Sequence, residues 1–243
     1  PQVNNQKVIY FTGNSLGLQP KRTKTYVDEV MNDWANLAVE GHFYADKPWW
    51  DYHERFAAPL SKIVGALPSE VTVMNTLTVN LHLLMVSFYK PTAKRYKIIC
   101  EEKAFPSDQY MFQSQVQFHA QNSGINANDA IVEIKRRDGE HNIRLEDIIS
   151  KINEVGDELA LVLIGGVNYY TGQVFDIKTI TAAGHKVGAK VGWDLAHAAG
   201  NIKLELHDWN VDFAAWCSYK YMNSGPGNAS GCFVHEKHHH ADL

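Results

Sequence analysis

From residue 71 onward, short strand-like runs alternate with longer segments of helical pattern. The strand-like runs cover residues 71–74, 96–100, 131–134, 159–164, 189–193, 213–218 and 231–234. The helical segments between them cover residues 75–89, 106–120, 144–155 and 176–187. Strands that alternate with helices of ten or more residues predict an α/β fold, a mostly parallel sheet with helices on both faces. Such sheets bind their ligands at the carboxyl ends of the strands.

The first 70 residues have a helical pattern without strands. Apolar side chains recur at helical spacing between Pro20 and Ala38, and we expect Gly41 to stop that helix. A second helix is expected from about Trp50 to Ala66. We therefore divide the chain into an N-terminal helical segment, 1–70, and a large sheet domain, 71–243. Only nine residues follow the last predicted strand, so we expect the large domain to be incomplete.

Composition narrows the class of protein. The formal net charge is −4, which gives no sign of nucleic acid or an anionic membrane as partner. The three cysteines lie in or beside apolar runs and are typical of reduced core thiols. No run approaches the ~18 apolar residues that a membrane span needs. We expect a soluble, cytoplasmic protein.

Two reactive side chains stand at the ends of predicted core strands. Lys220 follows the apolar run of residues 211–217, and Asp194 ends the run of residues 189–193. A lysine at a strand end is more often simply solvated. A lysine paired with a buried aspartate is, however, what a pyridoxal phosphate (PLP) enzyme needs, because the amine forms a Schiff base and the carboxylate keeps the pyridine nitrogen protonated.

Two strand-to-helix junctions offer further ligands. Thr76 and Thr78 stand at the start of a predicted helix, where free N–H groups bind phosphate readily. Phe105 and Asp108 occupy the next junction, where the ring could stack on a flat cofactor. Taken alone, each junction is better explained as an ordinary helix cap.

Three polar residues flank the lysine and the aspartate. His197 follows Asp194 by three positions and could steady that carboxylate or a phosphate. Tyr219 directly precedes Lys220 and could reach the phosphate or donate a proton, while Ser218 is a weaker phosphate ligand. A satisfied core histidine and an edge tyrosine are the ordinary alternatives.

Residues 235–239 match the H-E-x-x-H pattern of zinc proteases. That chemistry requires a helix that carries both histidines on one face. Here the pattern directly follows a core strand, so we predict no metal site. The sequence contains no G-x-G-x-x-G, no G-x-x-x-x-G-K-[ST] and no G-x-S-x-G motif.

Seven short motifs in this order and spacing resemble the kynureninase family, and the resemblance covers essentially the whole chain. They are Gly13-Asn14-Ser15-Leu16-Gly17, Met74-Asn75-Thr76-Leu77-Thr78-Val79-Asn80-Leu81-His82, Phe105-Pro106-Ser107-Asp108, Tyr170-Thr171-Gly172-Gln173, Asp194-Leu195-Ala196-His197, Leu206-His207-Asp208-Trp209 and Trp216-Cys217-Ser218-Tyr219-Lys220-Tyr221.

The resemblance implies a PLP-dependent hydrolase of fold type I, related to the class V aminotransferases. Such enzymes cleave the Cβ–Cγ bond of L-kynurenine or 3-hydroxy-L-kynurenine in tryptophan catabolism and NAD biosynthesis. The products are L-alanine and anthranilate or 3-hydroxyanthranilate. The resemblance also implies a homodimer, and it implies that a small C-terminal domain and a substrate-carboxylate arginine lie beyond Leu243.

The resemblance assigns roles to individual residues. The catalytic residues would be Lys220, as Schiff-base lysine and proton shuttle, Asp194 and Tyr219. The cofactor-binding residues would be Leu77, Thr78, Phe105, Pro106, Ser107, Asp108, Asp194, His197, Tyr219 and Lys220. Ser15 and His42 would lie on the substrate side.

Two alternatives stay open. A cysteine desulfurase or a class V aminotransferase would share the fold, although the motifs at residues 105–108 and 216–219 favour kynureninase. An inactive, truncated relative would bind PLP weakly or serve only as a partner subunit, although the intact Lys220 and Asp194 argue against decay. One departure stands out: Gly165 occupies a position where some family members have serine.

Overall fold

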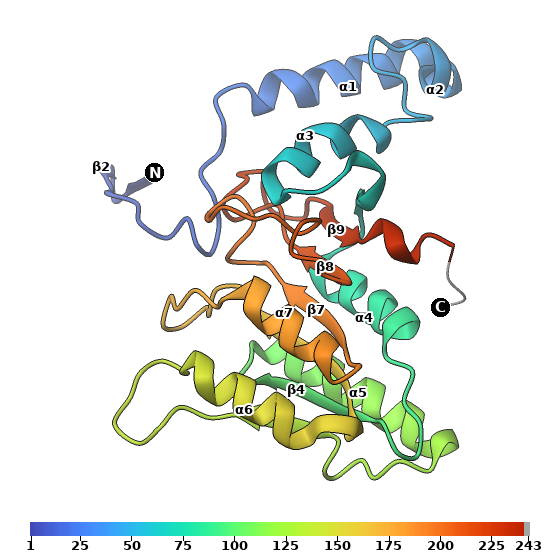
Figure 1. Cartoon of the computed structure of the whole chain (residues 1–243). Coiled ribbons are helices and arrows are strands. Elements are labelled where there is room, and N and C mark those ends of the chain that lie inside the picture. Colours follow the sequence, from blue (N-terminus) through green and yellow to red (C-terminus); the bar gives the residue numbers. More distant parts are fainter. Residues whose placement is uncertain (241–243) are drawn as a thin grey trace.

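The computed structural model describes residues 1–240, apart from the side chain of Asn122 (Figure 1). Its centre is a seven-stranded sheet in the order β3-β9-β8-β7-β6-β4-β5. The strands are β3 (Val71–Met74), β4 (Lys97–Glu101), β5 (Ile131–Ile134), β6 (Leu159–Gly165), β7 (Lys190–Asp194), β8 (Phe213–Trp216) and β9 (Ser230–Val234). The neighbours from β5 to β8 pair in parallel, and β9 is antiparallel to both β3 and β8.

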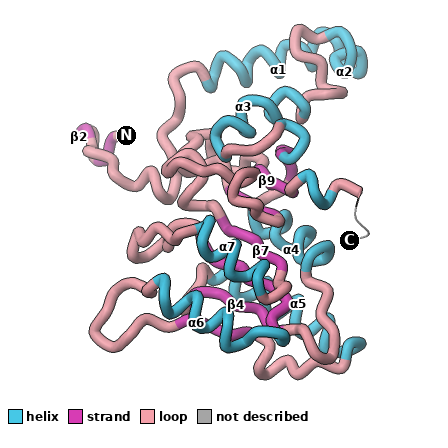
Figure 2. The backbone as a smooth tube through the Cα atoms, in the orientation of Figure 1, coloured by secondary structure: helices cyan, strands magenta, loops and turns pink. Residues whose placement is uncertain are grey.

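Helices cover both faces of this sheet (Figures 1 and 2). On one face, α4 (Leu77–Phe88) and α5 (Pro106–Ser123) bury Leu81, Met85 and Phe112 in one apolar core. On the other face, α6 (Leu145–Val155) and α7 (Ile177–Lys186) bury Ile152 and Ile180 in a second core. The predicted α/β fold with a mostly parallel sheet is confirmed.

The sequence explains these elements locally. β6 is apolar along its length because both of its faces are covered, and only its last residue, Gly165, is partly exposed. Asp176 begins α7 by accepting a hydrogen bond from the Thr179 N–H at 3.0 Å, as a helix cap should. Pro106 occupies the first turn of α5, where its missing N–H costs nothing.

The N-terminal part is more loosely attached. It contains β1 (Gln2–Val3), β2 (Gln6–Lys7), α1 (Thr23–Leu37), the 3-10 turn η1 (Ala38–Glu40), α2 (Gly41–Tyr44) and α3 (Glu54–Val64). No residue of α1 is buried, whereas α3 places Val64 in the sheet core. Gly41 does not stop the first helix as expected. Ala38 breaks it with a φ of 48°, and Gly41 begins the short α2.

The remaining 3-10 turns are η2 (Pro68–Glu70), η3 (Gly156–Glu158) and η4 (Glu236–His238). The strand predicted at residues 213–218 is too long, because β8 ends at Trp216, its last residue paired with β9. The chain then leaves the sheet and carries Tyr219 and Lys220 in a loop. The division of the chain at residue 70 stays a prediction. Among residues 1–240, no helix is both long and apolar enough to cross a membrane.

Candidate active site

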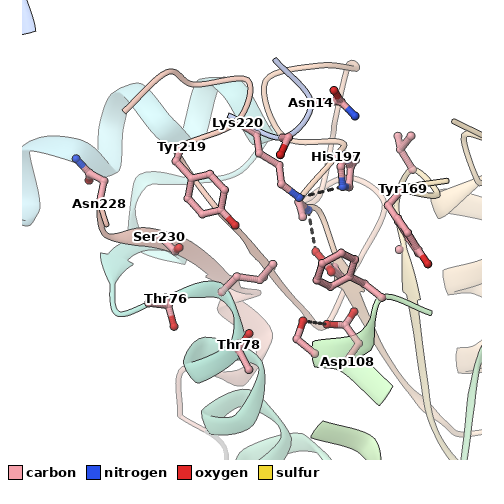
Figure 3. Close-up of a pocket in the computed structure, with 18 of the residues that line it drawn as sticks. Asn14, Thr76, Thr78, Asp108, Tyr169, His197, Tyr219, Lys220, Asn228 and Ser230 are labelled. Atoms are coloured by element: carbon pink, nitrogen blue, oxygen red, sulfur yellow. Dashed lines mark hydrogen bonds between the residues drawn. The ribbon is translucent and has the colours of Figure 1, made fainter. Parts of the chain in front are cut away.

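A cavity of about 660 Å³ opens at the carboxyl ends of the parallel strands, where the fold predicts a ligand (Figure 3). Residues from β4, β6, β7 and the loop after β8 converge on it. Most of the predicted site residues line it: Ser15, Leu77, Thr78, Phe105, Ser107, Asp108, Asp194, His197, Tyr219 and Lys220. The structure therefore assembles residues that lie up to about 200 positions apart in the sequence.

Lys220 is the only lysine among the residues that line this cavity, and only 9% of its surface is exposed. Its Nζ lies 2.9 Å from Nε2 of His197 and 5.9 Å from the centre of the Phe105 ring. Burial and the positive charge of Lys220 lower the pKa of His197 to about 4. His197 is therefore neutral near pH 7, and its ring nitrogen accepts a hydrogen bond from the Lys220 ammonium.

Asp194 and Asp108 form a buried pair of carboxyls beside the lysine. Asp194 ends β7, and its Oδ1 accepts a hydrogen bond from the Ala196 N–H at 2.8 Å. Burial raises the pKa of Asp194, while hydrogen bonds from Asp108 and Ala196 and the charge of Lys220 oppose that rise. Burial and the charge of Asp194 raise the pKa of Asp108 well above its usual range. Asp108 therefore keeps its proton and donates it in a hydrogen bond to Asp194, which carries the charge.

A third buried carboxyl, Glu101, also lines the cavity, and the sequence analysis missed it. Glu101 ends β4, and its Oε1 accepts a hydrogen bond from the Gly165 N–H at 3.2 Å. The sequence did contain a signal for Glu101: like Asp194, it is an acidic residue at the end of an apolar strand.

The start of α4 lies on one side of the cavity. The hydroxyl of Thr76 caps the helix through the Val79 N–H at 3.5 Å, so the first-turn N–H groups of Leu77 and Thr78 remain free for an anion. Ser230, on β9, also lines the cavity and was not predicted. The weaker candidate Ser218 does not line it, because its hydroxyl donates to the Ala229 carbonyl instead.

The opposite wall is aromatic. Phe105 is 45% exposed and meets Tyr169 edge to face, with ring centres 5.2 Å apart. Tyr169 follows β6 and was not predicted as a site residue. A half-exposed phenylalanine held at its edge by a tyrosine leaves one ring face open to a flat ligand.

The N-terminal segment contributes Asn14 and Ser15 (Figure 3 labels Asn14). The Gly17 N–H donates to the Tyr219 carbonyl at 2.7 Å and so ties this segment to the lysine loop. His42 does not reach the cavity. It lies in α2, where its ring packs edge-on against Trp49 at 5.4 Å. Pro106 begins α5 and shapes the junction without lining the cavity.

The H-E-x-x-H stretch does not form the helix that a zinc protease requires. It contains only the short η4, which is not the helix that would carry His235 and His239 on one face. His235 lies near Glu70, and His238, between the two histidines of the pattern, donates to Asp212 at 2.7 Å. Nitrogen and oxygen atoms of Glu70, His207 and His235 lie within 4.8 Å of one another. Yet protein donors already engage the Glu70 carboxylate: the N–H groups of Leu67 and Glu236, and Nδ1 of His207.

Known proteins match both the sequence and the fold. Residues 101–228 match the Aminotransferase class-V family. A kynureninase of Flavobacterium johnsoniae is 87% identical over 98% of this chain and 55% of its own length. The kynureninase of Homo sapiens is 53% identical over 97% of this chain and 50% of its own length. The chain thus spans about half the length of the curated relatives it matches.

Solved structures agree on the fold alone. A cysteine desulfurase from Thermococcus onnurineus NA1 superposes with a TM-score of 0.71 at 19% identity, over 95% of this chain and 54% of that one. The cystine C-S lyase C-DES superposes with a TM-score of 0.72 at 18% identity, over 94% of this chain and 57% of that one. The chain therefore belongs to the class V aminotransferase family, and within that family it is similar to the kynureninases.

Proposed function

We propose that this chain is the cofactor-binding part of a kynureninase, a PLP-dependent hydrolase that cleaves the Cβ–Cγ bond of L-kynurenine or 3-hydroxy-L-kynurenine. The observation that carries the proposal is that Lys220 and Asp194 share one cavity with the start of α4. The sequence identity of 53–87% to kynureninases supports the choice of substrate.

The residues of the cavity fit PLP. Asp194 is 7% exposed, and within residues 1–240 it forms no salt bridge with a protein side chain. A buried carboxylate of this kind is suited to a cationic pyridine nitrogen. The free N–H groups at the start of α4, together with the hydroxyls of Thr76 and Thr78, suit a phosphate. Lys220 supplies the amine that binds the aldehyde of the cofactor.

PLP, when bound, supplies an electron sink for carbanions at the substrate's Cα and Cβ. Asp194 would hold the proton on the ring nitrogen, and Asp108, which keeps its own proton, would orient Asp194. Lys220 binds the cofactor and then moves protons at the substrate's carbon atoms. His197 stays neutral and accepts a hydrogen bond from the Lys220 amine.

The walls of the cavity hold and orient the ring. Tyr169 fixes the angle of Phe105, which would cover one face of the cofactor ring. Burial raises the pKa of Tyr219 to about 12, so its phenol keeps its proton at neutral pH. Tyr219 is thereby suited to donate a proton during the reaction. Ser15 lines the cavity and is our candidate for the substrate side, and a substrate role for His42 stays a prediction.

We further infer a cytoplasmic homodimer that binds neither nucleic acid nor membrane. Cys100, Cys217 and Cys232 are all free and buried, which is typical of proteins from reducing compartments. The open cavity and the half-exposed Phe105 leave room for a second subunit to complete the site. A desulfurase or an aminotransferase would use the same fold, but the curated relatives at 53–87% identity are kynureninases.

Reductive trapping tests this proposal. The protein is incubated with PLP, reduced with borohydride and digested, and the peptides are weighed by mass spectrometry. We expect the cofactor's mass on the peptide that contains Lys220, and its loss in Lys220→Ala but not in Lys203→Ala, a surface lysine that pairs with Glu205. Wild-type protein loaded with PLP should release anthranilate from kynurenine before the borohydride step and should lose this activity after it. Cofactor on other lysines, or on none in the intact protein, would refute the proposal.

A further inference from the structure

The acidic residue that ends β4 has no part in the mechanism above. Glu101 is 5% exposed and lines the same cavity as Asp108, Asp194 and Lys220. Its side chain turns toward the neighbouring strand β6, where Oε1 accepts the Gly165 N–H at 3.2 Å. Gly165 is in turn the residue of β6 that pairs with Asp194 of β7. Glu101 and Asp194 therefore lie on strands that are separated only by β6.

Gly165 makes this position of the carboxyl possible. A Cβ at residue 165 would lie 3.0 Å from Glu101 Oε1, closer than side chains normally approach. The Glu101 carboxyl thus occupies space that a side chain at residue 165 would need.

The charged groups around the cavity determine the protonation state of Glu101. The titratable groups that face it are Asp194 of β7, Asp108 of α5 and Glu133 of β5, with Cys100 beside it on its own strand. Lys220 and His197 line the same cavity, and His197 is neutral. Among the residues that line the cavity, one ammonium therefore faces three carboxyls, those of Glu101, Asp108 and Asp194. Only one of them can be charged without a net negative charge in a buried site.

We propose that Glu101 is a positioning residue for Asp194, a carboxyl that keeps its proton below neutral pH beside the charged Asp194 and so leaves a single negative charge at the ring nitrogen. The inference rests on the proposed function, since it assigns Asp194 to that nitrogen. Burial, with the nearby charges of Asp194 and Glu133, raises the pKa of Glu101 to about 7, although hydrogen bonds from backbone N–H groups oppose the rise. Loss of this proton above neutral pH adds a second negative charge to the cavity.

The effect of this added charge on the bound cofactor can be measured. A carboxylate at Glu101 favours protonation of neighbouring groups, the nitrogen atoms of the bound cofactor among them. In wild type, the visible absorbance of the bound cofactor should therefore change with a midpoint near pH 7. A unit charge several ångströms away in a partly buried site moves a neighbour's titration by about one pH unit.

The test is a pH titration of the cofactor's absorbance in wild type, Glu101→Gln and Glu102→Gln. The amide in Glu101→Gln keeps the size and the acceptor for the Gly165 N–H but cannot ionise. We expect the step near pH 7 to vanish in Glu101→Gln, and the remaining titration to move about one pH unit lower. Glu102 pairs with Arg136 and does not line the cavity, so Glu102→Gln should behave as wild type. An unchanged step in Glu101→Gln overturns the proposal.

A second measurement needs neither the variant nor the cofactor. In wild-type protein labelled with carboxyl-¹³C glutamate, one glutamate should titrate near pH 7. Among the described residues, Glu101 is the glutamate whose pKa is raised. If every glutamate titrates below pH 6, the proposal is wrong whatever the variant does. Failure of PLP to bind Lys220 would instead refute the proposed function and leave this carboxyl titration to be judged on its own.

Discussion

The Nζ of Lys220 lies 2.9 Å from Nε2 of His197, although the two residues come from loops after different strands. His197 follows β7 and Lys220 follows β8, and the parallel pairing of β7 with β8 brings the two loops together. A buried ammonium is costly without a partner, and within the described residues Lys220 has no carboxylate at salt-bridge distance. The neutral ring of His197 therefore supplies the acceptor for this amine.

Replacement of His197 tests this contact. In His197→Ala the Lys220 amine loses its acceptor, and a hydrogen bond to a charged group contributes about 1.5–3 kcal/mol. We therefore expect the PLP-free protein to lose about 1.5–3 kcal/mol in the free energy of unfolding, with partial recovery in His197→Gln, whose side-chain oxygen accepts. Urea unfolding at pH 7 measures this loss.

The pH dependence supplies an independent check on His197. Its pKa is lowered from 6.5 to about 4 by burial and the charge of Lys220, so PLP-free wild type should lose stability as the pH falls from 6.5 to about 4, where the unfolded chain takes up the proton more readily. His197→Gln should lack this acid step. An acid step of equal midpoint in both proteins would show that another group titrates.

Substitution of Gly165 tests how closely Glu101 is held. The methyl group in Gly165→Ala would lie 3.0 Å from Glu101 Oε1 and push that carboxyl off the Gly165 N–H. We expect a loss of about 1 kcal/mol in the free energy of unfolding, the contribution of one buried hydrogen bond. Urea unfolding at pH 6 measures it. Gly13→Ala is the control, because a Cβ there meets nothing within 4 Å. Equal stability of both variants would contradict the contact.

The sequence predicted the side chains that follow apolar strands and carry a familiar chemistry. Asp194 and Lys220 stand out because burying a charged side chain at the end of a core strand costs free energy, and a functional role explains why the chain keeps it there. The same reasoning applied to Glu101, but its neighbour Glu102 made the end of the strand look like ordinary solvated charge. Only the structure shows that Glu101 turns inward to Gly165 while Glu102 pairs with Arg136.

Local sequence patterns could not predict the contacts between distant segments. Nothing in the run around Ser230 indicates that β9 inserts next to β3, because antiparallel insertion at the edge of a parallel sheet depends on the whole topology. The same holds for Tyr169, whose role depends on the position of Phe105, and for His42, which packs against Trp49 outside the cavity. Residue type and position predict chemistry at strand ends, and the pairing of strands decides which residues meet.

Removal of the Asp212 charge should strongly destabilise the protein. Asp212 is 2% exposed and accepts hydrogen bonds from the Val191 N–H, His185 and His238, each at 2.7 Å, while Lys237 lies at 3.0 Å. We expect Asp212→Asn to lose about 3 kcal/mol at pH 7, because buried donors lose their charged acceptor. Urea unfolding checks this, with the exposed Asp208→Asn as control.

The loss in Asp212→Asn should also depend on pH. Burial alone would raise the pKa of Asp212, but the hydrogen bonds and the charge of Lys237 hold it far below its usual value of 3.8. A lowered carboxylate pKa gives stability that is present above the unfolded value and is lost as the pH falls below it. The difference between wild type and Asp212→Asn should therefore shrink below about pH 4. A constant difference down to pH 2.5 would contradict the charged state of Asp212.

The pair formed by Glu70 and His207 should stabilise the protein in a limited pH range. His207 Nδ1 lies 2.9 Å from Glu70 Oε1, and the Glu236 N–H donates to the same oxygen, which fastens η4 to η2. The hydrogen bond to Glu70 raises the pKa of His207 above 6.5, so its contribution is complete below pH 6.5 and disappears as the pH rises through the raised value. Although burial opposes it, the hydrogen bonds from Leu67, Glu236 and His207 lower the pKa of Glu70 below 4.5, so its contribution disappears only in acid.

Both partners are therefore charged between about pH 4.5 and 6.5, and the effect of His207→Ala should be largest there. We expect a loss of about 1 kcal/mol at pH 5.5, since the His207 side chain is 29% exposed, and a smaller loss at pH 8.5. Urea unfolding at the two pH values measures the difference, with the exposed His141→Ala as control. An equal loss at pH 5.5 and 8.5 would mean that packing of the ring, and not the ion pair, fastens η4 to η2.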